Sequence, residues 1–90
     1  MPSISKKKRN KISEQILSYL YEISPEASFT VKIAENIIRD EEFTKSLLEE
    51  LEKSKLVTKV TKGPQGQDYS RWQRWRMSNA AFEAYKNLNN

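Results

Sequence analysis

The sequence predicts an α+β domain that is mostly helical, and three observations carry this prediction. Before residue 55, apolar residues recur every three to four positions in three separate stretches, which is the spacing of helices with one buried face. After Lys55 the residues are typical of strands, and both glycines of the chain fall between two such runs. After Met77 the spacing is helical again.

The first helix is predicted from Lys11 to about Ile23, because the chain then meets Pro25, which disfavours helical angles at the residue before it. A second helix follows, and Thr30 is predicted to cap it by accepting from a backbone N–H. The buried stripe of this second helix is expected to hold Ile33, Ala34, Ile37 and Ile38.

The third helix is predicted to begin after Asp40 as its N-cap, with Glu41 and Glu42 in the first turn, where the helix dipole favours them. Residues 56–61 and 69–77 are predicted strands, and residues 63–67 form the turn between them. Ser78 is the predicted cap of the last helix. The apolar faces of the third and last helices are expected to hold Phe43, Leu47, Leu48, Leu51, Ala81, Phe82, Tyr85 and Leu88.

The second predicted strand divides its side chains between two faces, because successive residues of a strand alternate. One face holds Tyr69, Arg71, Gln73, Trp75 and Met77, and the other holds Ser70, Trp72, Arg74 and Arg76. We expect Trp75 to fill the core beside Met77. Trp72 either stacks on a base, a sugar or a partner side chain, or packs against the last helix, and the sequence leaves both open.

Charge is segregated along the chain, although the net charge is only +4. Residues 1–11 carry five positive charges and no negative one, residues 40–52 carry a net −5, and residues 53–76 carry a net +6. Such segregation suggests a polyanionic partner. Residues 1–10 lack apolar periodicity and are predicted to form a flexible basic arm, with the domain itself over residues 11–90.

The composition excludes several classes of function. The absence of Cys and His removes disulfides, zinc fingers, thiolate chemistry and imidazole catalysis. Adjacent carboxylates such as Glu41 and Glu42 splay across a helix and cannot converge on one substrate bond. There is no Gly-rich phosphate loop, no secretory signal and no apolar run that could span a membrane. We therefore expect a cytoplasmic protein that is not an enzyme and uses no metal or cofactor.

The predicted elements follow the order helix, short extended segment at Phe29, helix, tight turn, helix, β-hairpin, helix, and this order resembles a winged helix-turn-helix domain. Residues 30–38 (TVKIAENII) look like the second helix of winged-helix regulators, and residues 47–57 (LLEELEKSKLV) look like the end of their recognition helix. Residues 75–81 (WRMSNAA) are similar to the last wing strand and following helix of MarR-like and PadR-like regulators. Two features depart from that family: Ala81 replaces a frequent Gly, and the recognition helix is unusually acidic.

The resemblance, which covers residues 11–88, implies a transcriptional regulator that binds double-stranded DNA, with or without sequence specificity. Together with the charges it gives three groups of expected contacts. The wing would supply Lys59, Lys62, Gln65, Gln67, Arg71, Trp72, Arg74 and Arg76. The arm would supply Lys6, Lys7, Lys8, Arg9 and Lys11, and the first turn of the third helix would supply Thr44 and Lys45.

Other interpretations stay open at this point. The wing charges can instead serve to suppress strand-to-strand aggregation, the arm can serve only solubility, and the glutamates of the third helix can keep that helix away from DNA. The resemblance further implies a homodimer through the first and last helices, with Tyr85 and Leu88 at the interface. Two rival functions are a protein-interaction module that docks a basic partner on its acidic third helix, and an RNA-binding module that stacks bases on Trp72.

Overall fold

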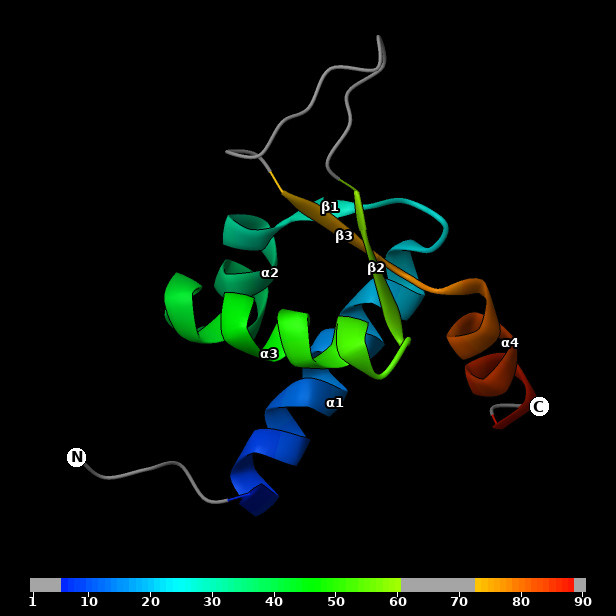
Figure 1. Ribbon diagram of the computed structural model, residues 1–90, viewed down its shortest axis with the longest axis horizontal. Helices are drawn as coiled ribbons and strands as arrows, with labels where there is room; N and C mark the ends of the chain where they lie inside the picture. The colour runs from blue at the N-terminus through cyan, green and yellow to red at the C-terminus, as the bar shows by residue number, and fades with distance from the viewer. Residues whose placement is uncertain (1–5, 61–72, 89–90) are drawn as a thin grey trace, which may run out of the picture.

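The computed structural model describes residues 6–60 and 73–88. In this part of the chain, four helices support a three-stranded antiparallel sheet with the strand order β1-β3-β2 (Figure 1). The elements are α1 (Lys6–Ile23), β1 (Ser28–Phe29), α2 (Thr30–Ile37), α3 (Glu41–Lys53), β2 (Val57–Val60), β3 (Arg74–Met77) and α4 (Asn79–Leu88). The predicted α+β, mostly helical winged helix-turn-helix architecture is confirmed.

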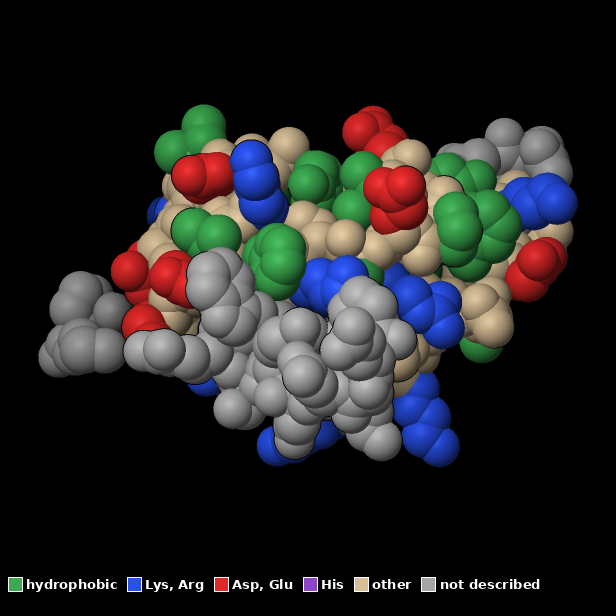
Figure 2. Space-filling view, turned by 90° about the horizontal axis from the view of Figure 1, so that it is seen from above, with side chains coloured by type: hydrophobic (Ala, Val, Ile, Leu, Met, Phe, Trp, Pro, Cys, Tyr) green, Lys and Arg blue, Asp and Glu red, His purple; other side chains and the backbone are tan. Residues whose placement is uncertain are grey.

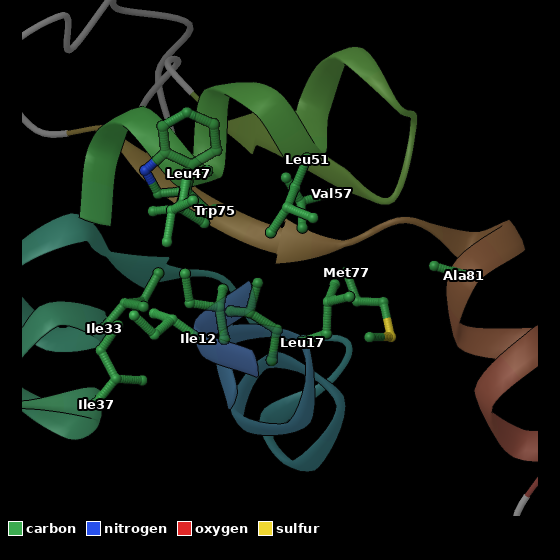
Figure 3. Close-up of a cluster of buried hydrophobic side chains, with 13 residues drawn as sticks. Ile12, Leu17, Ile33, Ile37, Leu47, Leu51, Val57, Trp75, Met77 and Ala81 are labelled. Carbon is green, nitrogen blue, oxygen red and sulfur yellow. The ribbon is translucent and has the colours of Figure 1, made fainter. Parts of the chain in front are cut away.

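The core lies between α1, α2, α3 and one face of the sheet (Figure 3). Trp75, Leu47 and Ile33 contribute buried side chains from three different elements, as the periodicity predicted. The β-strands pair so that Val57 is opposite Met77, and both side chains are buried. Since opposite residues of an antiparallel pair share a face, this register points one side of the sheet inward.

A buried hydrogen bond joins the sheet to the helices. Trp75, which is fully buried, donates its Nε1–H to the hydroxyl of Thr30 at 2.8 Å, and that hydroxyl lies 3.4 Å from the carbonyl oxygen of Gln73. The prediction that Thr30 caps α2 is therefore wrong: Phe29 is the N-cap residue and makes no side-chain capping bond. The hydroxyl serves the indole instead, because a buried N–H without an acceptor is costly.

Helix α1 begins at Lys6, so the predicted flexible arm over residues 1–10 is wrong for residues 6–10, and residues 1–5 lie outside the described part of the chain. Lysine and arginine favour helices, and the apolar periodicity used for the prediction cannot register a polar first turn. Arg9 also anchors this turn to α3: its guanidinium pairs with the carboxylate of Glu50 and lies 5.7 Å from the ring centroid of Phe43.

Helix α2 ends at Ile37, one residue earlier than its apolar stripe suggested. Ile33, Ala34 and Ile37 are buried as predicted, but Ile38 has a left-handed backbone (φ 56°, ψ 55°) and its side chain is 87% exposed. The prediction that Ile38 lies in the buried stripe is therefore wrong, because the left-handed residue turns its side chain out of the helical register.

Helix α3 begins as predicted. The carboxylate of Asp40 accepts a hydrogen bond from the backbone N–H of Phe43 at 3.0 Å, which is an N-cap contact. Leu47, Leu48 and Leu51 are buried, and Phe43 is partly buried against the same core.

The hairpin strands and α4 follow the sequence with shifted bounds. Residues 57–60 form β2, where residues 56–61 were predicted, and β3 begins at Arg74 within the described residues. The predicted strand residues 69–72 lie outside them. The hydroxyl of Ser78 accepts from the backbone N–H of Ala81 at 3.1 Å, so the predicted cap of α4 is confirmed.

Helix α4 packs on α1 through aromatic rings. The ring of Tyr21 lies 5.2 Å from that of Phe82 and 5.5 Å from that of Tyr85, measured between centroids. Burial, and after it the nearby carboxylate of Glu14, raise the pKa of Tyr85 above its usual value. Leu88 does not join this contact and is 81% exposed. Across the described residues, no helix is long and apolar enough to cross a lipid bilayer.

The Trp75–Thr30 hydrogen bond predicts a stability effect. Thr30→Val keeps the side-chain volume but leaves the buried indole N–H without an acceptor, which should lower the free energy of unfolding by about 1–3 kcal/mol. Thr30→Ser, which retains the hydroxyl, is the control. Urea unfolding followed by tryptophan fluorescence measures both, and a valine variant as stable as the serine variant would contradict the assigned role of this bond.

The N-cap of α3 predicts a second effect. Asp40→Ala should reduce the free energy of unfolding by about 1 kcal/mol, whereas Asp40→Ser should retain most of the stability, because serine also caps helices. Thermal unfolding followed by circular dichroism compares the two variants. Equal losses in both would mean that the cap contributes nothing.

Candidate nucleic-acid interface

The side of the sheet that faces away from the core is formed by Phe29, Thr58, Val60, Arg74 and Arg76, and we call it the outer face. The strand pairing defines it: Arg74 lies opposite both Phe29 and Val60, and Arg76 lies opposite Thr58. Their neighbours in the strands, such as Trp75 and Met77, are buried. None of the five residues of the outer face is acidic.

Local contacts orient the two arginines. The guanidinium carbon of Arg74 lies 5.9 Å from the ring centroid of Phe29, within the range of a cation–π contact. The guanidinium of Arg76 lies 3.3 Å from the carbonyl oxygen of Met77 and 3.5 Å from the side-chain oxygen of Asn79. Both side chains are half-buried. Because guanidinium groups bind phosphates in a planar, two-pronged geometry, two of them side by side suit a phosphate backbone.

Lys59 lies on the other side of the ribbon. It is opposite Trp75 in the strand register, and its Nζ lies 5.3 Å from the centroid of the Trp75 ring. The expected wing cations of the described residues therefore do not form a single row: Arg74 and Arg76 point outward, whereas Lys59 lies along the edge of the core-facing side.

Only one of the two side chains expected to reach DNA from the start of α3 lies at the surface. Thr44 was expected to reach DNA, but it is fully buried and its hydroxyl donates to the carbonyl oxygen of Asp40 at 2.8 Å, so this expectation is wrong. The cause is helical geometry, which places Thr44 one turn before the buried Leu47 and Leu48. Lys45 remains at the surface and is half-buried.

The exposed surface of α3 is largely acidic. Its exposed residues are Glu41, Glu42, Glu49, Glu50 and Lys53. Figure 2, which shows the molecule from the side of the sheet, has Lys and Arg side chains near the middle of this face, and Asp and Glu side chains at both ends and along one edge. Carboxylates repel phosphates, so α3 opposes the close approach that a recognition helix makes.

The basic residues of α1 form a separate group. Lys6, Lys7, Lys8 and Lys11 are exposed on the first turns of this helix. Figure 1 shows these turns on the side of the molecule away from the sheet. Arg9, on the same turns, is held by Glu50 and Phe43. The expected arm cations therefore do not share a surface with the outer face.

The remaining expected residues belong to the hairpin and to the dimer interface. The expected contacts Lys62, Gln65, Gln67, Arg71 and Trp72 lie outside the described residues. Of the residues expected at a dimer interface, Tyr85 is half-buried against Tyr21 and Leu88 is exposed. Phe29 has a role under Arg74 that was not expected, although an isolated aromatic residue before a helix start was a usable signal.

Neither a comparison with protein-family models nor a comparison with curated proteins finds a match. Solved structures do match. The S. aureus MepR–DNA complex has a TM-score of 0.74 and 19% identity over 92% of this chain and 65% of that one. Lactococcus lactis ZitR, as an E41A mutant, has a TM-score of 0.70 and 21% identity over 99% of this chain and 56% of that one.

A smaller protein matches over nearly its whole length. The Zalpha domain of Carassius auratus PKZ, solved in complex with Z-DNA, has a TM-score of 0.64 and 17% identity over 78% of this chain and 97% of that one. The chain spans only 65% of the MepR chain and 56% of the ZitR chain. The similarity at these identities concerns the fold, and it shows that this chain folds as a winged helix-turn-helix domain.

Proposed function

We propose that this protein binds double-stranded DNA through the outer face of its sheet and the adjoining hairpin, and that it acts as a regulator of transcription rather than as an enzyme. The observation that carries the proposal is the pair Arg74 and Arg76, held side by side on the outer face of the sheet. Two of the similar winged-helix structures hold DNA, which supports the choice of ligand.

The two arginines are suited to phosphates by their preorganisation. The ring of Phe29 supports Arg74, and Asn79 lies beside Arg76, so less side-chain entropy is lost when a phosphate binds. Each phosphate neutralised by such a cation releases counterions, which makes the affinity depend steeply on salt. The sequence places Lys62 and Arg71 in the same hairpin, and we propose that they extend the contact.

The proposal differs from the usual docking of a helix-turn-helix, in which the N-terminal residues of the recognition helix read base edges. Here the first turn of α3 carries Glu41 and Glu42, and Thr44 is buried. Contacts to the backbone through the sheet position a protein on DNA but carry little sequence information. We therefore propose binding with low sequence specificity.

The proposal predicts a defined loss of affinity. Arg74→Ala with Arg76→Ala should weaken binding to duplex DNA by tenfold or more at moderate salt, and should reduce the slope of log K against log salt by about 2. The matched control is Lys32→Ala with Lys53→Ala, which removes the same charge from exposed positions on α2 and α3. Fluorescence anisotropy at several salt concentrations measures both variants.

If the two double variants bind duplex DNA equally well, net charge alone governs binding and the proposed face is wrong. Parallel titrations with single-stranded DNA and structured RNA separate the ligand classes. Tighter binding to either of these than to duplex DNA would contradict the proposed ligand.

A further inference from the structure

Two side chains stand out as exposed and apolar. Among the described residues, Ile38 and Leu88 are the most exposed large hydrophobic residues, at 87% and 81%. They lie at opposite ends of the molecule: Figure 1 shows α2 and the start of α3 at one end of the longest axis and α4 at the other.

Ile38 carries a conformational cost as well as an exposed side chain. It occupies the left-handed position of a Schellman motif, in which the N–H of Arg39 donates to the carbonyl of Ala34 at 3.0 Å and that of Ile38 donates to the carbonyl of Glu35 at 3.3 Å. Gly or Asn normally fills this position, because a β-branched side chain is strained at positive φ. The isolated chain recovers none of this cost by burying the side chain.

The surroundings of Ile38 define what could cover it. A shallow hollow at the α2–α3 corner is lined by Val31, which is 47% exposed, and by Ala34 and Ile38. The rest of its lining is Glu35, Arg39, Asp40 and Glu41. Three carboxylates against one guanidinium make the rim acidic, so a complementary partner presents an apolar side chain next to a positive charge.

The other end of the same chain carries both kinds of side chain, two positions apart on α4. Leu88 and Lys86 are both exposed in the last turn of α4. A symmetric pairing of two α2–α3 corners would instead bring two acidic rims together, which is unfavourable. The dimer expected from the resemblance, with Tyr85 and Leu88 at its interface, would be a different pairing; of these residues, Tyr85 is half-buried and packs on Tyr21.

We propose that copies of this chain associate head to tail, with Leu88 of one copy packing on Ile38 and Val31 of the next, and Lys86 facing the carboxylates of Glu35 and Glu41. The Leu88 patch and the Ile38 patch lie at opposite ends of the molecule. When two copies associate, each therefore still has one patch open, and the contact can repeat into a row. So small a contact is weak in solution. It becomes effective when several copies are held on one DNA molecule, a consequence that rests on the proposed function.

The first experiment needs no DNA. Sedimentation velocity from about 10 µM to about 1 mM should show a weight-average sedimentation coefficient that rises with protein concentration and falls with added salt. Ile38→Asn should abolish the rise while increasing Tm by roughly 4–8 °C, because asparagine tolerates the left-handed conformation. If Ile38 had only a structural role, the substitution would change Tm and leave the association of the protein unchanged.

The chain contains a matched control for the relief of strain. Lys55 is the other non-glycine residue with positive φ in the described part, at 63°, and it occupies the same position of a Schellman motif after α3. Lys55→Asn should also raise Tm, but it should leave association unchanged, because Lys55 presents no apolar side chain to a partner. Loss of association in this variant would overturn the assignment to Ile38.

Mixing two variants tests the polarity of the contact. Ile38→Asn retains the Leu88 end, Leu88→Gln retains the Ile38 end, and each should be monomeric alone. An equimolar mixture should form 1:1 dimers that grow no further, since only one intact pair of ends remains. A mixture that stays monomeric, or wild-type protein that stays monomeric at about 1 mM, overturns the proposal.

An experiment with DNA distinguishes this proposal from the proposed function. On a duplex long enough for several copies, wild-type protein should bind cooperatively, and Ile38→Asn should bind with the same single-site affinity but without cooperativity. Failure of wild-type protein to bind a short duplex would refute the proposed function and leave the sedimentation result standing. Cooperativity that survives in Ile38→Asn would overturn the head-to-tail contact.

Discussion

The hydrogen bond between Trp75 and Thr30 is the constraint on which the arrangement of the sheet depends. It fixes the largest core side chain of β3 to the first residue of α2, forty-five positions earlier in the chain. Once Trp75 points inward, the two-residue period of a strand turns Arg74 and Arg76 outward. The same bond therefore closes the core and presents the arginines, and a slip of one residue would exchange the two sets.

Much of the fold could be predicted from the sequence because its signals are local. Asp40 and Ser78 cap their helices as predicted, and the apolar period located the leucines of α3 and the indole of Trp75 in the core. The predicted start of α1 was wrong because the first turn of this helix is stabilised by a contact between Arg9 and Glu50, which are 41 positions apart. The periodicity of a short stretch of sequence cannot reveal a contact between residues so far apart.

The candidate site was predictable in kind but not in geometry. Charge segregation identified the basic hairpin, yet the sequence does not say which cations share a face or which are already paired. The register separates Lys59 from Arg76, an internal carboxylate holds Arg9, and burial removes Thr44 from the surface. The acidic surface of α3 was visible in the sequence, and the structure gives it a consequence, since it shifts the proposed DNA contact from the helix to the sheet.

The proposed function requires that DNA contacts the sheet and not α3. Titration of isotope-labelled protein with a short duplex, followed by NMR, tests this claim residue by residue. We predict that the side-chain Nε–Hε signals of Arg74 and Arg76 and the backbone amides of β3 shift, while the amides of Glu42 and Glu49 stay in place. Shifts confined to the exposed residues of α3, with unchanged arginine signals, would contradict the account.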